Sequence, residues 1–417
     1  MSSGIFGGIN LSGKVLDLIS INFKDVKIYT MSKTVFVKVN AESIANKIYC
    51  ASNNFVMLTF EGKIYNCEHE KFFDINNLTL NYNLNKIYGK FAIAVADNNG
   101  NISLTRDYPG LVPMFYCLQN DVFVFSTIYG LLETLKFKKV QIVPPGKKVF
   151  YENRKLLTVS WYQQSLKKLS NSNLIEHLDN LFDTVVSEII KFHKNFRFGI
   201  MLSGGVDSAL LSYYISKHLP SSNIYSYTID GEDRNYGEQV SKIFGFKFNL
   251  IDNYLIKKEK ILFSSYDYNK QFDNLNNSLF IPVYLIAKKA KKDGVNLLFS
   301  GDGVDEIFGG YDMNCDKKSV NIAIKKMLDN MFLYSLDRLS SACNINNIDI
   351  AVPFLHQKII EAALSVDSEY KKDKFLIRKI AEKHLPQNIV WRKKTPLQVS
   401  TQSYELLYNK KWVGLHH

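Results

Sequence analysis

The sequence contains few cysteines, and none of them lies in a pair that could bind a metal. Five cysteines are scattered through 417 residues, and no CxxC motif occurs among them. This spacing excludes a zinc ribbon and a disulfide framework, and it favours a reducing compartment.

Long apolar runs are absent as well. No stretch approaches the roughly 20 apolar residues that a membrane-spanning helix needs. The first ten residues, MSSGIFGGIN, lack the charged segment and apolar core of a signal peptide. We therefore expect a soluble, cytoplasmic protein with no membrane partner.

Arginine-rich runs and base-stacking motifs are also lacking, although the formal net charge is +12. The lysines are spread through the chain in pairs such as Lys288-Lys289 and Lys291-Lys292. This distribution is typical of a lysine-rich composition rather than of a nucleic-acid-binding face. We expect no nucleic-acid partner, although a positive field can attract ATP or an acidic peptide.

The chain is long enough for two domains, and its two parts differ in the periodicity of their apolar residues. Residues 1–162 contain short alternating or apolar runs, which predict a mostly β domain with few helices. The clearest runs are Thr34–Asn40, Phe55–Phe60, Gly89–Ala96 and Val122–Ser126, and asparagine, proline and glycine turns separate them. Another asparagine-rich stretch, Asn274–Asn277, is predicted to mark a loop.

Residues 173–417 alternate between helical and strand-like patterns, and Tyr162–Ser172 is the predicted linker. Strand and helix in alternation indicate a parallel sheet covered by helices, an α/β fold. The predicted helices are Asn173–Phe192, Asp207–His218 and Tyr236–Ile243, and the predicted strands are Phe196–Leu202, Ile224–Ile229 and Val295–Phe299.

The first glycine loop follows a predicted strand. Residues Phe198–Ser208 read FGIMLSGGVDS. Adjacent glycines let backbone N–H groups approach a ligand closely, and the N-terminus of the next helix favours an anion. Ser203 and Ser208 add hydroxyl donors, and Asp207 suits this place if it holds a divalent cation that bridges phosphates. An SGG turn alone would indicate only a tight strand-to-helix connection, but the full string predicts a phosphate site.

The second glycine loop, Leu298–Tyr311, reads LFSGDGVDEIFGGY and also follows a buried strand. Ligands bind at the carboxyl ends of parallel strands, where both loops are expected to lie. Asp302, Asp305 and Glu306 stand within five residues of one another, between apolar and glycine positions. Carboxylates in this setting suit magnesium binding or work near a reacting amine.

These loops carry a resemblance to known families. SGGVDS resembles the signature of the ATP pyrophosphatases, which cleave ATP to AMP and pyrophosphate, and it differs from the GxxxxGK[ST] loop of kinases. SGDGVDEIFGGY resembles the second fingerprint of the asparagine synthetase family. Further matches follow in order, namely Asp337–Ser340 (DRLS), Val352–Leu355 (VPFL), Lys374–Arg378 (KFLIR) and Trp391–Lys394 (WRKK).

The resemblance implies roles for individual residues, with ATP and Mg²⁺ as the cofactors. Asp207 and Asp305 bind magnesium, while Lys374 and Lys394 face the phosphates and the acyl-adenylate. A lysine in that place can stabilise charge on the α-phosphate and on the tetrahedral oxyanion. The pyrophosphate end of ATP is held by Ser203, Gly204, Gly205 and Ser208, and the nucleotide lies near Thr228, Ile229, Ser300 and Gly301.

The first domain resembles the glutamine-hydrolysing domain of the same family, an Ntn-hydrolase-like α+β fold. Gly4–Gly7 (GIFG) matches the segment after the nucleophilic cysteine, and Phe60–Asn66 (FEGKIYN) matches FNGEIYN. Arg106–Tyr116 (RDYPGLVPMFY) resembles RDxxGxxPLYY. The family therefore implies a degenerate amidotransferase domain over residues 1–162 and a parallel-sheet ATP pyrophosphatase domain over 173–417.

Departures from the family pattern indicate that glutamine hydrolysis is lost. Ser3, behind two further residues, stands where the family has an N-terminal cysteine. Glu61 replaces the asparagine that donates to the oxyanion, and an ionised carboxylate would repel that oxyanion. The glutamine-binding stretch is missing, because only 52 residues separate GIFG from FEGKIYN. We expect no ammonia to be generated internally.

A degenerate first domain makes the chain similar to the β-lactam synthetases and lasso-peptide macrolactam cyclases, which use an amine already present in the substrate. Asp302 occupies the third position of SGxG, and Asp349 matches the position of a glutamate in the β-lactam enzymes. We predict that Asp302, Asp349 or both orient and deprotonate the amine. The spacing from Asp337 to Asp349 is three residues longer than usual, with Cys343–Asn347 as the predicted insertion.

Three classes of function remain open at this stage. The first is an intramolecular amide ligase whose substrate is a small molecule or peptide that bears a carboxylate and an amine. The second is an ammonia-dependent asparagine synthetase or a related amidating enzyme, and the third is an inert scaffold. A precursor peptide and a partner protease are expected partners if the product is a macrocycle.

Overall fold

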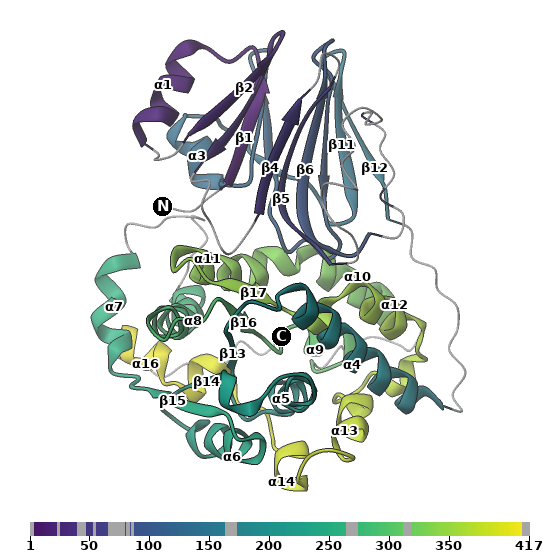
Figure 1. Ribbon diagram of the computed structural model, residues 1–417, viewed down its shortest axis with the longest axis vertical. Coiled ribbons are helices and arrows are strands. Elements are labelled where there is room, and N and C mark those ends of the chain that lie inside the picture. Colours follow the sequence, from purple (N-terminus) through teal and green to yellow (C-terminus); the bar gives the residue numbers. More distant parts are fainter. Residues whose placement is uncertain are drawn as a thin grey trace. The chain divides into compact units, whose positions relative to one another are not determined.

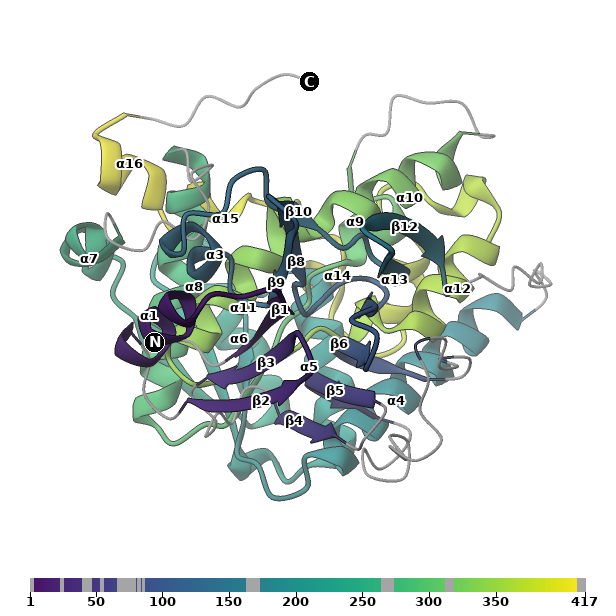
Figure 2. The ribbon, with the colours of Figure 1, turned by 90° about the horizontal axis from the view of Figure 1, so that it is seen from above.

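The computed structural model describes residues 4–22, 26–39, 47–52, 56–65, 80, 84, 87–162, 173–263, 274–311 and 319–410. The chain divides into two compact units, Met1–Gln164 and Ser165–His417 (Figures 1 and 2). Most of the predicted linker, residues 163–172, lies outside the described residues. No helix of the described part is long and apolar enough to cross a membrane.

The first unit is built on two six-stranded antiparallel sheets, which confirms its mostly β character. One sheet has the order β10-β8-β9-β1-β3-β2 and the other β12-β11-β7-β6-β5-β4. The strands of the first sheet are β1 (Gly4–Ile9), β2 (Lys27–Met31), β3 (Thr34–Val39), β8 (Phe115–Gln119), β9 (Val122–Ser126) and β10 (Gln141–Ile142). Those of the second are β4 (Lys47–Ser52), β5 (Val56–Ile64), β6 (Gly89–Asp97), β7 (Ile102–Arg106), β11 (Lys147–Glu152) and β12 (Lys155–Ser160), and the helices are α1 (Gly13–Asn22) and α3 (Tyr129–Thr134).

Alternation along the strands explains why the two sheets pack face to face. On β6, Ala92, Ala94 and Ala96 join a core that also contains Phe36 and Phe125 of the other sheet. The intervening residues of β6 face the opposite side, where a second core gathers around Phe60 and Phe91. A period of two places successive side chains on opposite faces, so both faces of this sheet are buried.

The RDYPG turn after β7 is held by two buried charged side chains that bond its backbone. Asp107 accepts hydrogen bonds from the backbone N–H groups of Phe91, Gly110, Leu111 and Val112 at 2.7–3.0 Å. Arg106 donates to the carbonyl oxygens of Val112 and Val143 at 2.8 and 3.2 Å, and also to that of Gly110. Such pairing satisfies the polar groups of a buried turn, so this motif serves the fold of the unit.

The second unit is built on a five-stranded parallel sheet with the order β15-β14-β13-β16-β17, which confirms the predicted α/β fold. Its strands are β13 (Phe198–Met201), β14 (Ile224–Ile229), β15 (Lys247–Ile251), β16 (Leu297–Phe299) and β17 (Asp349–Ala351). The predicted strand Ile224–Ile229 coincides with β14, whereas β13 and β16 are shorter than the predicted apolar runs. The flanking apolar residues of those runs lie in the connecting segments.

Helices follow the strands as an α/β fold requires, and α6 and α8 both pack on β14. The helices are α4 (Leu174–Phe192), α5 (Val206–His218), α6 (Arg234–Phe244), α7 (Leu255–Phe263), α8 (Asn274–Lys292), α9 (Val304–Phe308), α10 (Val320–Met331), α11 (Asp337–Ile345), α12 (Gln357–Ser365), α13 (Phe375–Ala381), α14 (Gln387–Val390), α15 (Leu397–Ser400) and α16 (Ser403–Tyr408). A π-helical segment, Phe332–Leu336, joins α10 to α11, and short 3₁₀ segments cover Ser221–Asn223, Pro353–Leu355 and Ser368–Tyr370.

The loop predicted at Asn274–Asn277 is wrong, because α8 begins at Asn274. Asparagine is common at helix N-termini as well as in turns. A run of asparagines therefore marked the start of a helix rather than a loop.

His356 caps helix α12 in a way that requires a neutral imidazole. Its Nδ1 accepts a hydrogen bond from the backbone N–H of Lys358 at 3.2 Å. Burial, with a smaller contribution from the charge of Lys358, lowers the pKa of His356 to about 3. A protonated Nδ1 could not accept this bond, so the cap is lost when the ring is charged.

Replacing His356 with asparagine is expected to make the protein more resistant to acid. The unfolded chain binds a proton to His356 below about pH 6.5, whereas the folded chain does so only near pH 3, so wild-type stability falls as the pH drops through this window. His356→Asn keeps a capping oxygen without the titration. Between pH 7.5 and pH 4 the variant should lose roughly 2–4 kcal/mol less unfolding free energy than the wild type in urea titrations. Equal losses in both proteins would contradict this role of the ring.

Candidate active site

The two glycine loops lie side by side at the carboxyl edge of the parallel sheet. Strands β13 and β16 are hydrogen-bonded neighbours, so the loops that follow them emerge together. A Cβ added to Gly301 would lie 3.1 Å from the backbone nitrogen of Ser208 and 3.3 Å from Cβ of Asp207. The second loop therefore contacts the first through a position that only glycine fits comfortably.

The first loop is folded by its own serines and by a left-handed glycine. The hydroxyls of Ser203 and Ser208 lie 3.2 Å apart, and the backbone N–H of Gly205 donates to Oγ of Ser203 at 3.3 Å. Gly204 has φ +68°, and a Cβ there would lie 2.4 Å from Cβ of Tyr236. The turn opens helix α5 at Val206, whose N-terminus provides unpaired N–H groups for an anion.

The neighbouring predicted nucleotide residues surround this turn. Thr228 and Ile229 end strand β14 and are buried, and the Thr228 hydroxyl donates to the carbonyl oxygen of Leu202 at 2.6 Å. Ser300 follows β16, where its N–H donates to the carbonyl oxygen of Ala351 at 2.9 Å. Its hydroxyl donates to Oδ2 of Asp302. The residues predicted from the first and second loops are thus brought to one edge of the sheet.

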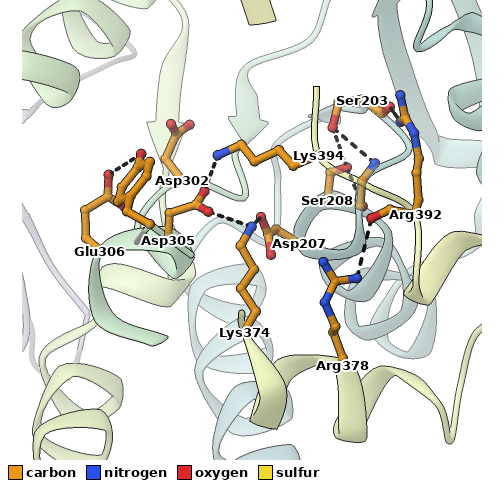
Figure 3. Close-up of polar contacts among 12 residues, drawn as sticks. Ser203, Asp207, Ser208, Asp302, Asp305, Glu306, Lys374, Arg378, Arg392 and Lys394 are labelled. Atoms are coloured by element: carbon orange, nitrogen blue, oxygen red, sulfur yellow. Dashed lines mark hydrogen bonds and ion pairs between the residues drawn. The ribbon is translucent and has the colours of Figure 1, made fainter. Parts of the chain in front are cut away.

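A chain of alternating charges crosses the junction of the two loops (Figure 3). Nζ of Lys374 lies 2.5 Å from Oδ2 of Asp207 and 2.8 Å from Oδ1 of Asp305. Nζ of Lys394 lies 2.5 Å from Oδ2 of Asp305. The lysines come from segments far along the chain, so the site joins each loop to the C-terminal part of the unit.

Burial and pairing act in opposite directions on these groups. Burial raises the pKa of Asp207 in spite of the Lys374 ammonium beside it. Burial also acts to raise the pKa of Asp305, but the charges of Lys374 and Lys394 outweigh it and leave that pKa lowered. Burial opposes the charge on Lys374, yet the two carboxylates raise its pKa, so Lys374 stays protonated between them.

Lys374 is held in a strained backbone conformation. Asp373 and Lys374 have φ +50° and +56°, in the left-handed region that side chains other than glycine rarely adopt. Lys374 is the residue before α13, and its N–H reaches the carbonyl oxygen of Gly309 in the second loop at 3.4 Å. Strain of this kind persists only where surrounding contacts fix it, and it gathers at functional sites. Here it directs the ammonium between the two carboxylates.

Asp207 and Asp305 have the donor chemistry that a magnesium ion prefers, because both offer carboxylate oxygens. Oδ1 of Asp207 is buried and accepts no hydrogen bond from any described residue, and Gly310 leaves room beside Asp305, since a Cβ there would lie 1.9 Å from its Oδ1. Among the described residues no group of three or more His, Cys, Asp or Glu side chains could hold a metal. Magnesium is commonly bound by one or two carboxylates together with phosphates and water, so a pair suffices.

Glu306 and Tyr311 form a further polar pair on the second loop. The Tyr311 hydroxyl donates to Oε1 of Glu306 at 3.2 Å, and Nζ of Lys394 lies 5.3 Å from the centre of the Tyr311 ring. Burial and then the charge of Asp305 raise the pKa of Glu306 to about 7. The sequence marked Glu306 as one of three clustered acids, but it did not indicate this partner.

The prediction that Asp349 lies at the site is wrong. Asp349 begins β17 and pairs in register with Leu297, the first residue of β16, so it lies at the amino end of the sheet. It is fully buried, and its Oδ2 lies 3.2 Å from Nε2 of His193. The glycine loops emerge from the opposite edge, so Asp349 cannot reach an amine bound there. Asp302, the other residue predicted as base, is part of the second glycine loop.

Two arginines of the site were not given roles by the sequence. Arg392 donates from Nη1 to the carbonyl oxygen of Ser203 at 2.9 Å. Arg378 donates from Nε to the carbonyl oxygen of Asp373 at 3.0 Å and from Nη1 to that of Val390. Arg378 lies in the KFLIR stretch and Arg392 in the WRKK stretch. These motif matches were the sequence feature that could have indicated both residues.

In the first unit, Glu61 stands at the position where the family has an asparagine that donates to the oxyanion. Glu61 on β5 is 3% exposed and accepts a hydrogen bond from the Thr127 hydroxyl. The same hydroxyl accepts the backbone N–H of Ile5 at 3.0 Å. Ser3, the predicted counterpart of the nucleophile, lies outside the described residues.

Comparisons with known proteins agree with this geometry. The family model described as asparagine synthase matches residues 178–322 and 316–414, more than half of the chain. Asparagine synthetase B [glutamine-hydrolyzing] of Escherichia coli is 22% identical over 94% of this chain and 75% of its own length. Asparagine synthetase [glutamine-hydrolyzing] of Asparagus officinalis is 25% identical over 73% of this chain.

A protein of Methanocaldococcus jannaschii named asparagine synthetase [glutamine-hydrolyzing] 1 is 25% identical over 72% of this chain. The chain spans 60% of the length of that relative and 56% of the Asparagus one. The matched segments contain both glycine loops and the two lysines that meet at Asp305. The chain therefore belongs to the asparagine synthase family.

Proposed function

We propose that this protein activates a carboxylic acid with ATP, releases pyrophosphate, and passes the acyl group from AMP to an amine. The observation that carries this proposal is the alternating chain Asp207–Lys374–Asp305–Lys394 at the junction of the two glycine loops. Two cations next to a helix N-terminus suit the transfer of a negatively charged adenylyl group.

In the first step a carboxylate oxygen attacks the α-phosphorus of ATP, and the bond to pyrophosphate breaks. The Ser203–Ser208 turn and the N-terminus of α5 would hold the leaving pyrophosphate, while Thr228, Ile229, Ser300 and Gly301 would line the nucleotide site. Asp207 and Asp305 would hold magnesium, which neutralises phosphate charge when bound. Lys374 would balance the negative charge of these two carboxylates and of the phosphates.

In the second step the amine nitrogen attacks the acyl carbon, AMP leaves, and one proton of the amine must be removed. Lys394 reaches the site from a segment that leaves its side chain about half exposed, so its ammonium can face the oxyanion. Asp302 would accept the proton, as a carboxylate on the same loop as Asp305. The products are an amide, AMP and pyrophosphate.

The amine is proposed to come from the substrate itself rather than from glutamine. The relatives are named as glutamine-hydrolyzing enzymes, but here Ser3 and Glu61 replace residues on which that chemistry depends. The buried Glu61 accepts a hydrogen bond where the family needs a donor. These departures favour an intramolecular cyclase of the β-lactam synthetase or lasso-peptide type, and an ammonia-dependent asparagine synthetase is the alternative.

Pyrophosphate release with a panel of acids tests this proposal. We expect release with an amino-bearing acid or peptide and none with aspartate plus ammonia. Release with aspartate plus ammonia would refute the cyclase and support the alternative. Silence with every acid, at saturating MgATP, would favour a scaffold.

Glutamine is expected to change the rate of pyrophosphate release by less than about twofold, because Ser3 and Glu61 replace the cysteine and the asparagine of the family pattern. Restoring one residue should not help, so Glu61→Asn should hydrolyse no glutamine and should leave pyrophosphate release unchanged. Coupled assays for glutamate and pyrophosphate measure both quantities. Glutamate formation by the wild type would show that the nitrogen source is wrongly assigned.

A further inference from the structure

Arg392 contacts two loops at the carboxyl edge of the sheet at once. Nη1 donates to the carbonyl oxygen of Ser203, in the loop after β13, at 2.9 Å. Nη2 donates to Oδ1 of Asp233, which precedes α6 in the loop after β14. Both side chains of the ion pair are at least nine-tenths buried, with exposed fractions of 9% and 8%. A buried, doubly bonded guanidinium fixes its neighbours more firmly than a surface ion pair does.

A third contact connects Arg392 to the Ser203–Ser208 turn of the first glycine loop, which we call the phosphate loop. The guanidinium carbon lies 4.0 Å from the centre of the Tyr236 ring. Tyr236 in turn packs its Cβ and backbone against Gly204, where an added Cβ would come within 2.4 Å. Arg392 and Gly204 therefore hold the same residue from two sides. A displacement of the loop toward α6 at Gly204 would therefore push on Tyr236, because interiors are closely packed.

The backbone around Arg392 is held in place by a second arginine, Arg378. Arg378 donates from Nη1 to the carbonyl oxygen of Val390, and the same nitrogen lies 3.5 Å from that of Arg392. Lys394 follows two residues later and reaches Asp305. Within residues 390–394, Arg392 thus contacts the phosphate loop and Lys394 contacts the second glycine loop (Figure 3). We call this segment the bridge.

Only a guanidinium suits these three contacts. It is planar, donates in a fixed fork, and stacks on an aromatic ring, whereas an ammonium is a single point charge. A lysine at position 392 could reach Asp233 or the Ser203 carbonyl, but it could not lie flat over Tyr236 while bonding both.

We propose that Arg392 is a positioning residue that couples occupancy of the phosphate loop to the placement of Lys394. This inference rests on the proposed function. When the pyrophosphate end of ATP occupies the Ser203–Ser208 turn, the coupling holds Lys394 in the position that the acyl-transfer step requires. The side chain of Arg392 contacts Ser203, Asp233 and Tyr236, and neither proposed metal ligand is among these described partners. In this proposal Arg392 therefore acts through Lys394.

Hydrogen exchange tests the coupling without any acid substrate. Inorganic pyrophosphate with magnesium should slow amide exchange in residues 390–396 of the wild-type chain by about tenfold, since the bridge is held at both ends. Arg392→Met should abolish this slowing, and Arg392→Lys should restore only part of it. Lys393→Met, which removes an exposed charge from the same segment, should keep the full effect.

Kinetics with the active acid give the second readout. Arg392→Met should lower kcat by about 100-fold, the typical cost of a misplaced catalytic group, while the Kd of MgATP changes by less than about threefold. In a Lys394→Met background the same change should lower kcat by less than about threefold, because the residue through which it acts is gone. Independent losses in the double variant would show a merely structural role and overturn the proposal.

The two proposals fail in different ways. Slowed exchange with pyrophosphate but no pyrophosphate release with any acid would leave the coupling standing and refute the ligase function. Release in the wild type without any slowing at residues 390–396 would refute the coupling alone. Loss of the slowing in Lys393→Met would also refute it, because then segment charge rather than the Arg392 contacts would be responsible.

Discussion

Replacing Lys394 with methionine is expected to lower the rate of amide formation by about 10³-fold while MgATP still binds. Removing one preorganised group that stabilises transition-state charge costs about 10²–10³-fold in known sites. Lys394 also neutralises Asp305, so its loss leaves a proposed metal ligand with one cation fewer. The side chain is about half exposed, and the fold should therefore tolerate the change.

Lys393→Met is the matched control for this prediction. Lys393 is the adjacent, exposed residue of the same segment, and its replacement removes the same formal charge. Product formation followed by chromatography, with MgATP affinity from calorimetry, separates chemistry from binding. A Lys394→Met enzyme within about threefold of the wild type would remove Lys394 from the mechanism.

Replacing Lys374 with methionine should damage both activity and stability. The Lys374 side chain is 5% exposed and lies between two carboxylates. Breaking a buried ion pair by removing one partner typically costs about 3–5 kcal/mol, because a buried charge is left without compensation. We therefore expect a loss of that size in unfolding free energy at pH 7, and at least about a 10³-fold loss of activity.

The stability loss of Lys374→Met should depend on pH in a defined direction. Without the ammonium, the folded-state pKa values of Asp207 and Asp305 rise, so the destabilisation is present above those values and shrinks as the pH falls through them. Urea titrations at pH 7 and pH 4 measure this difference, with the exposed Lys372→Met as the control. An equal deficit at both pH values would mean that lost packing, not uncompensated charge, explains the effect.

The sequence predicted the framework of the site because local signals sufficed for it. Strand β14 coincides with its apolar run, and the glycine strings located both loops at strand ends. The position of a residue along its strand was harder to predict, as Asp349 shows. Asp349 is the first residue of a short strand, so it lies at the edge of the sheet opposite the loops. The spacing from Asp337 to Asp349, three residues longer than usual in the family, was the sequence feature that spoke against aligning Asp349 with the catalytic glutamate.

The tertiary contacts within the site could not be predicted in this way. Lys374 is 167 residues from Asp207 in the chain, and no local pattern encodes that contact. The left-handed conformation of Lys374 depends on the packing of the second loop against it rather than on its own preference. Arg392 belonged to a matched motif, but its partners Asp233 and Tyr236 stand in no motif at all.

The origin of the oxygen in AMP tests the central claim most directly. With an acid substrate labelled with ¹⁸O in its carboxyl group, the protein should form AMP and pyrophosphate in equal amounts, and the AMP should carry one labelled oxygen from the acid. Mass spectrometry of the nucleotide measures this transfer. Formation of ADP and phosphate, or of AMP without label, would contradict activation of the carboxylate through an acyl-adenylate.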